Sequence, residues 1–148
     1  MKKRVIVPIM VLVISSALIM LFCFVSTSEI KNLGEDFYYL PKWVAIDVGN
    51  PYGSMIYKSR ERDAYSQDDI IVNQGILQVV SDEFFILYVQ NKSQNDSEKD
   101  NIPYYWGIIQ KEPTERLGPY DYHDYCNAKN ILGVPNNLRL KYERKMQK

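Results

Sequence analysis

The chain has 148 residues and little of what catalysis or metal binding requires. It contains one histidine, His123, and two cysteines, Cys23 and Cys126, so it offers no cysteine and histidine cluster for a metal ion. No glycine-rich phosphate-binding loop, HExxH motif or GxSxG motif is present. We therefore expect no metal, no cofactor and no enzymatic activity.

The chain also lacks net charge, with 18 basic against 18 acidic side chains. Three of the bases, Lys2, Lys3 and Arg4, precede a long apolar run, and the remaining chain is left at about −3. A mildly acidic body lacks the positive surface that binds polyphosphate. Nucleic acid is therefore not expected as a partner.

Residues 5–25 carry no charge. A helix of that length spans ~31 Å, close to the hydrocarbon thickness of a bilayer. The basic residues before it predict a cytoplasmic N-terminus and a body outside a single-pass cell membrane. Residues 1–28 are thus predicted to be a transmembrane anchor or a signal peptide. The small residues Ser26 and Ser28 suit leader cleavage, which would give a secreted or periplasmic protein. Lipoprotein-like attachment through Cys23 is disfavoured by the bulky Phe22 before it.

Residues 29–36 are polar and are expected to form a tether, followed by an extracytoplasmic α+β domain over 37–148. Short apolar runs bounded by turn residues predict an antiparallel sheet of about six strands with one C-terminal helix packed on a face. We expect hairpins formed by 43–48 with 54–58 and by 70–72 with 76–80. A longer strand is expected at 83–90, and its apolar run without alternation predicts a central strand covered on both faces. A further strand is expected at 104–109, and a short edge strand at 138–142.

The helix is expected to begin at Pro119, the favoured first helical position, and to end before Gly133. Tyr122, Tyr125, Ala128 and Leu132 then share one face, which we expect to be buried.

Cys126 and His123 are three residues apart on this helix, so the histidine could reach the thiol and act as its base in a small Cys-dependent hydrolase. The structural alternative is a cysteine that acts as a small buried hydrophobic residue, next to a solvated helix terminus. We prefer the structural alternative because no third residue completes a site.

Aromatic residues are the one feature above the ordinary: 12 Tyr, 5 Phe and 2 Trp. Runs of consecutive aromatics place side chains on both faces of a strand. Tyr38, Tyr104 and Trp106 are our candidates for a ligand-binding face. The alternative is cross-strand pairing that only stabilises the sheet.

Several segments in order resemble a family of small secreted or lipid-anchored bacterial proteins of unknown function, of the Bacteroidetes type. They are Phe37–Leu40, Asp69–Val72, Tyr104–Lys111, Gly118–Tyr120, Leu132–Pro135 and Leu138–Leu140. The chain departs from the family at the lipid-attachment motif, where Phe22 precedes Cys23. The resemblance implies an extracytoplasmic fold and brings no catalytic residues. The sequence as a whole predicts a membrane-anchored, outward-facing, non-enzymatic domain that binds an envelope protein or a glycan. An immunity or inhibitor protein that binds a partner protein is the second hypothesis.

Overall fold

The computed structural model describes residues 29–47, 53–91 and 104–146. The predicted membrane segment 5–25, Cys23 and the turn at 49–52 lie outside these ranges. Within the described ranges no helix has the length and apolar character needed to cross a bilayer.

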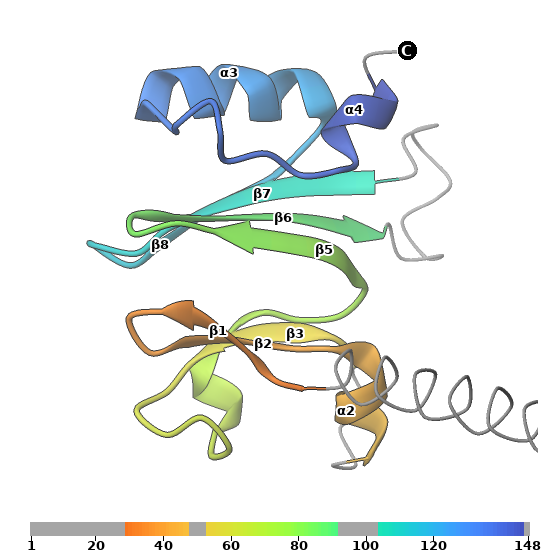
Figure 1. Cartoon of the computed structure of the whole chain (residues 1–148), viewed down its shortest axis with the longest axis vertical. Coiled ribbons are helices and arrows are strands. Elements are labelled where there is room, and N and C mark those ends of the chain that lie inside the picture. The colour runs from red at the N-terminus through yellow and green to blue at the C-terminus, as the bar shows by residue number, and fades with distance from the viewer. Residues whose placement is uncertain (1–28, 48–52, 92–103, 147–148) are drawn as a thin grey trace, which may run out of the picture.

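The described chain forms three layers (Figure 1): two sheets face each other, and two helices cover the outer face of the second sheet. The first sheet and its connections comprise β1 (Lys31–Gly34), β2 (Phe37–Leu40), α2 (Lys42–Asp47), β3 (Met55–Lys58), the 3-10 turn η1 (Gln67–Asp69) and β4 (Ile70–Val72). The second sheet and the helix layer comprise β5 (Ile76–Ser81), β6 (Phe85–Asn91), β7 (Tyr104–Gln110), β8 (Glu115–Tyr120), α3 (Tyr122–Leu132) and α4 (Glu143–Met146).

The expected single sheet of about six strands is wrong. Two four-stranded sheets form instead, with the orders β1-β2-β3-β4 and β5-β6-β7-β8, and every neighbouring pair is antiparallel. The prediction fails at the expected hairpin of 70–72 with 76–80, whose two strands do not pair with each other. Gln74 and Gly75 do adopt left-handed conformations, at φ 64° and 66°. The turn nevertheless passes the chain from β4 in one sheet to β5 in the other, because burial between the sheets decides the pairing.

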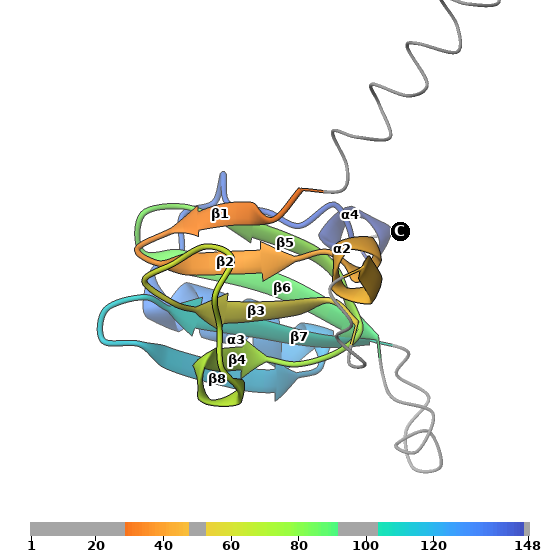
Figure 2. The same cartoon turned by 90° about the horizontal axis from the view of Figure 1, so that it is seen from below.

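Three apolar clusters hold the layers together. The first lies between the sheets, the second between the β5–β8 sheet and the helix layer, and the third on the outer face of the β1–β4 sheet under α2 and the 59–69 segment (Figures 1 and 2). β6 contributes Tyr88 to the first cluster and both Leu87 and Val89 to the second. The prediction that this strand is central and covered on both faces is confirmed.

Four local predictions fail. Residues 31–34, expected in a tether, form β1 on the edge of the first sheet. Trp43 and its neighbours, expected in a strand, form the short helix α2. Pro119 lies in the edge strand β8, where its missing N–H costs no ladder bond, and does not start the helix. Residues 138–142 form no strand.

Helix α3 otherwise follows its prediction. Asp121 is the N-cap and its carboxylate accepts a hydrogen bond from the Asp124 N–H at 2.8 Å. Gly133 ends the helix in the left-handed conformation, at φ 68°. Tyr125 is fully buried, and Tyr122, Ala128 and Leu132 pack against the same cluster. The mixed α+β class is therefore confirmed, whereas the arrangement of the sheet is not.

Candidate functional site

The structure does not bring the three candidate aromatic residues together. Tyr38 lies on the outer face of the first sheet, 9% exposed, with its ring 5.5 Å from that of Tyr57. Trp106 is 1% exposed beneath α3, where its ring stacks 5.1 Å from Tyr125. Tyr104 makes an edge contact with Tyr142 at 5.4 Å. These residues serve two different apolar clusters and form no common binding face.

His123 and Cys126 have separate environments. The imidazole is exposed, and its Nδ1 lies 3.5 Å from Asp124 Oδ1 and 3.2 Å from Asn127 Nδ2. Cys126 is half-buried and packs against the cluster beneath α3. Among the described residues no hydrogen bond joins the two side chains. The arrangement is that of a solvated helix start beside a structural thiol.

Three possible metal ligands gather at the start of α3. Donor atoms of Asp121, His123 and Asp124 lie within 4.8 Å of one another, and all three residues are exposed. The Asp121 carboxylate is already used as the helix cap. The group is thus explained by capping and by the preference of acids for a helix N-terminus.

Two largely buried lysines fasten separate parts of the chain together. The Lys129 ammonium lies 3.1 Å from the Glu143 carboxylate, which also accepts a hydrogen bond from the Tyr125 hydroxyl at 2.9 Å. This network fastens the C-terminal segment to α3. Burial, followed by the Glu143 charge, raises the pKa of Tyr125 above its ordinary value. A hydroxyl that keeps its proton is suited to donating this bond rather than to acid–base chemistry.

Lys111 is the second buried cation, with 2% exposure. Its Nζ donates to the carbonyl oxygens of Leu33 at 2.6 Å and Asp82 at 2.5 Å. Desolvation lowers the pKa of Lys111, and the acids Glu35, Asp82 and Glu83 oppose that shift. Because Leu33 lies on β1 of the first sheet and Asp82 lies in the β5–β6 turn of the second, Lys111 joins the two sheets at one end of the sandwich.

A hollow of about 700 Å³, here called the α2 groove, opens on the outer face of the first sheet. It is bounded by the residues preceding β1, by α2 and by the segment after β3. Its lining is mainly apolar and consists of Glu29, Ile30, Leu40, Val44, Arg62, Asp63, Ala64 and Tyr65. A concave, largely apolar site with a few charged groups is the usual form of a ligand site.

Tyr65, which lines the α2 groove, is backed by two further tyrosines. The ring of Tyr65 packs 4.7 Å from that of Tyr57, which in turn stacks on Tyr38. The Tyr57 hydroxyl donates to the Arg62 carbonyl oxygen and so holds the loop that carries Arg62. Burial, followed by the charge of Asp63, raises the pKa of Tyr57 to about 12. The tyrosine stack is therefore fixed by packing and by a hydrogen bond before any ligand arrives.

A second, more polar hollow of about 490 Å³ lies alongside and shares Ala64 with the α2 groove. Its other lining residues are Asp36, Lys58, Ser59, Arg60, Glu61 and Asp69. Charges of both signs line it, and the Lys58 ammonium is already held by the Thr114 hydroxyl at 2.8 Å. It lacks a single dominant charge that would select a ligand.

The sequence analysis selected Tyr38, which stacks behind the groove, but it did not predict the α2 groove itself. One sequence feature did point to this face of the sheet: the consecutive apolar residues Met55, Ile56 and Tyr57, all of which are buried. A strand that is apolar on consecutive positions is covered on both faces. That pattern indicated a covered outer face on the first sheet, but not which segments cover it.

Comparison with curated proteins and with solved structures found no match. A family model described as a protein of unknown function, DUF3997, matches residues 45–147. That range takes in the end of α2, the later strands of the first sheet, the whole second sheet and the helix layer. The expectation of a family of unknown function is confirmed, and the chain belongs to the DUF3997 family.

Proposed function

We propose that this chain is a non-enzymatic binding domain, held on the outer side of the cell membrane by its N-terminal segment. In this proposal the α2 groove takes the apolar part of an envelope component. The observation that carries the proposal is the groove itself, whose apolar lining is backed by a rigid tyrosine stack. The uncharged run 5–25 supports the anchor.

The chemistry of the lining favours an apolar or amphipathic partner over a bare glycan. Ile30, Leu40 and Val44 offer no hydrogen bonds to hydroxyl groups, whereas Arg62 and Asp63 can orient a polar end at the opening. A protein segment with apolar side chains fits this lining, and so the immunity or inhibitor hypothesis is a special case of the same site. The hydrolase hypothesis has no comparable support, since His123 and Cys126 face different environments.

Site-directed photocrosslinking in living cells tests the groove. We would replace Tyr65, which lines the groove, by p-benzoylphenylalanine, and place the same group at Ile131, which is 85% exposed on α3, as the control. We expect a crosslinked adduct from position 65 and not from position 131. In a chain that also carries Ala64→Arg, the added side chain fills the groove, and the adduct should be lost.

Equal adducts from both positions, or an adduct that survives Ala64→Arg, would contradict ligand binding in the groove. The anchor is tested separately by alkaline carbonate extraction of cell membranes. The full chain should stay in the membrane pellet, and a chain without residues 1–28 should not. Release of the full chain into the supernatant would overturn the anchored half of the proposal.

A further inference from the structure

Helix α2 presents a large apolar side chain to solvent. Trp43 is 72% exposed, although Ala45 on the same helix is fully buried under the first sheet. The neighbouring Lys42 is exposed as well. An indole beside an ammonium is the pairing found where proteins meet the headgroup layer of a bilayer, because each side chain has an apolar body and a polar end.

The described chain begins beside this helix. Glu29 and Val44 line the same groove, so the residues before β1 and helix α2 lie side by side (Figure 2). The predicted membrane segment ends at Val25, four residues before Glu29. Four residues span at most ~14 Å when fully extended. With Val25 at the edge of the hydrocarbon, α2 is kept within reach of the headgroup layer.

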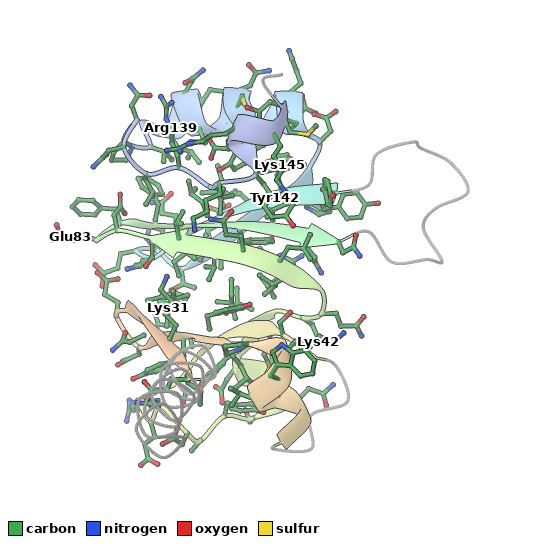
Figure 3. The ribbon with its side chains drawn as sticks, turned by 45° about the vertical axis from the view of Figure 1, so that its right-hand side comes forward. Lys31, Lys42, Glu83, Arg139, Tyr142 and Lys145 are labelled. Carbon is green, nitrogen blue, oxygen red and sulfur yellow. The ribbon has the colours of Figure 1, made fainter. Side chains whose placement is uncertain are left out.

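The charges around the start of the chain suit a phospholipid surface. Lys31 on β1 and Lys42 on α2 project from the first sheet and its helix (Figure 3), and both are exposed. Glu29 is the exposed acid near them, while Arg62 and Asp63 pair with each other at 3.5 Å. Among the side chains that the structure describes there, the two lysines outnumber the unpaired acid Glu29, and they can approach lipid phosphates.

The opposite end of the sandwich has a different character. Glu83 lies at the end away from Lys42 (Figure 3), in the turn between β5 and β6. Glu35 and Asp36 occupy the turn between β1 and β2 at that same end. Lys58 and Arg60 share a hollow with Asp36, so the acids of these turns are in excess there but not alone. An excess of acid is repelled by anionic lipid. The difference in charge between the two ends therefore favours an orientation in which the Lys42 end faces the bilayer and the Glu83 end faces away from it.

We propose that α2 docks on the outer surface of the bilayer, with the Trp43 indole in the headgroup layer and Lys42 beside lipid phosphates. This inference rests on the anchor in the proposed function, and not on the ligand of the α2 groove. Docking fixes how the domain stands on the membrane: the acidic turns point away from it, and the α2 groove opens next to the lipid surface.

Tryptophan fluorescence tests the docking, because Trp43 and the buried Trp106 are the two tryptophans of the chain. The full chain is placed in vesicles of phosphatidylglycerol and phosphatidylcholine, with or without brominated acyl chains. The difference between this chain and Trp43→Phe isolates the Trp43 emission. We expect brominated lipid to quench that emission and aqueous iodide to leave it largely unquenched.

A matched control moves the indole to the far end. Phe84 is 60% exposed in the turn beside Glu83, so Phe84→Trp in the Trp43→Phe chain gives an indole of similar exposure away from the membrane. Its emission should be quenched by iodide and not by brominated lipid. Carbonate extraction of the same vesicles shows independently whether the chain is anchored.

The outcomes separate the two proposals. If Trp43 is quenched by iodide and not by brominated lipid while the chain resists carbonate, docking is overturned and the anchor stands. If carbonate releases the chain and brominated lipid leaves Trp43 unquenched, both fail. If Trp43 is open to iodide in vesicles but shielded in cells, a protein covers α2 and the lipid assignment is wrong.

Discussion

Gly107 lies at the centre of the second sheet, directly opposite Tyr88 on the neighbouring strand. A methyl group placed on Gly107 would lie well inside 3.0 Å of the Tyr88 ring, closer than real side chains approach. The ring has no free space to move into, since Tyr88 is fully buried between the sheets and its hydroxyl accepts a hydrogen bond from Arg116 Nε at 3.1 Å. The glycine therefore makes room for the tyrosine.

The variant Gly107→Ala should lower the free energy of unfolding by about 3 kcal/mol or more, the upper part of the range for overpacked cores. Without the clash, alanine in a strand is better than glycine by roughly 0.5–1 kcal/mol. In a Tyr88→Ala background the same change should therefore cost nothing or stabilise slightly. Tyr88→Ala alone should cost about 3–5 kcal/mol for the cavity it leaves.

Urea unfolding of the full chain in a mild detergent measures all four members of this cycle. The emission of the buried Trp106, adjacent to Gly107, reports unfolding of the second sheet. Additive effects of the two substitutions would refute the reasoning, because they would mean that the Tyr88 ring does not occupy the space above Gly107.

Three further predictions concern single side chains. Tyr125→Ala should lower stability by about 3–5 kcal/mol, since Tyr125 is fully buried, while His123→Ala should change it by less than about 0.5 kcal/mol, since His123 is exposed; thermal melts compare the two. Tyr57 has a pKa of 10.0 when unperturbed and about 12 in the fold, so its contribution to stability is complete below pH 10 and is lost as the pH rises towards 12. Alkaline melts of Tyr57→Phe should show a smaller loss over that interval. In a Cys23→Ser chain, iodoacetamide should alkylate the half-buried Cys126 faster after unfolding than before it, and rapid alkylation of the native chain would return the Cys-dependent hydrolase to consideration.

Much of the local structure could be predicted because it depends on neighbouring residues. The limits of α3 follow from the Asp121 cap and from Gly133, and its buried face follows from helical spacing. The central position of β6 follows from an apolar run without alternation. In these cases the deciding interactions lie within a few residues along the chain, or in the burial of one element.

The pairing of strands could not be predicted in the same way. β4 and β5 are joined by a turn with the expected left-handed residues Gln74 and Gly75, yet they belong to different sheets. Either arrangement satisfies the turn, and the choice is made by contacts between distant strands. The short run from Trp43 to Val48 is equally ambiguous, because apolar segments of this length suit a strand or a buried helix.

The candidate site was missed for a related reason. The α2 groove is formed by the residues just before β1, by α2 and by the segment that holds Arg62 and Tyr65. No short motif connects them, and the tyrosine stack that backs the groove requires Tyr38 and Tyr57 to face the same side of adjacent strands. The sequence showed that the chain is rich in aromatic residues, but it did not show where in the fold these residues gather.

The high aromatic content has a structural explanation, which leaves fewer aromatic residues as candidates for a functional role. Three layers in a small domain create apolar clusters on both faces of each sheet, and large flat side chains such as Tyr57, Trp106 and Tyr125 fill these clusters. The aromatic content therefore reflects the number of layers rather than a stacking platform. Among the described aromatic residues, Trp43 and Phe84 are the exposed ones, and they lie at opposite ends of the sandwich. Of these two residues, Trp43 lies on the helix beside Glu29, where the described part of the chain begins. Under the proposed anchor, the N-terminal segment would hold this tryptophan near a bilayer, and the membrane is therefore the first partner to test.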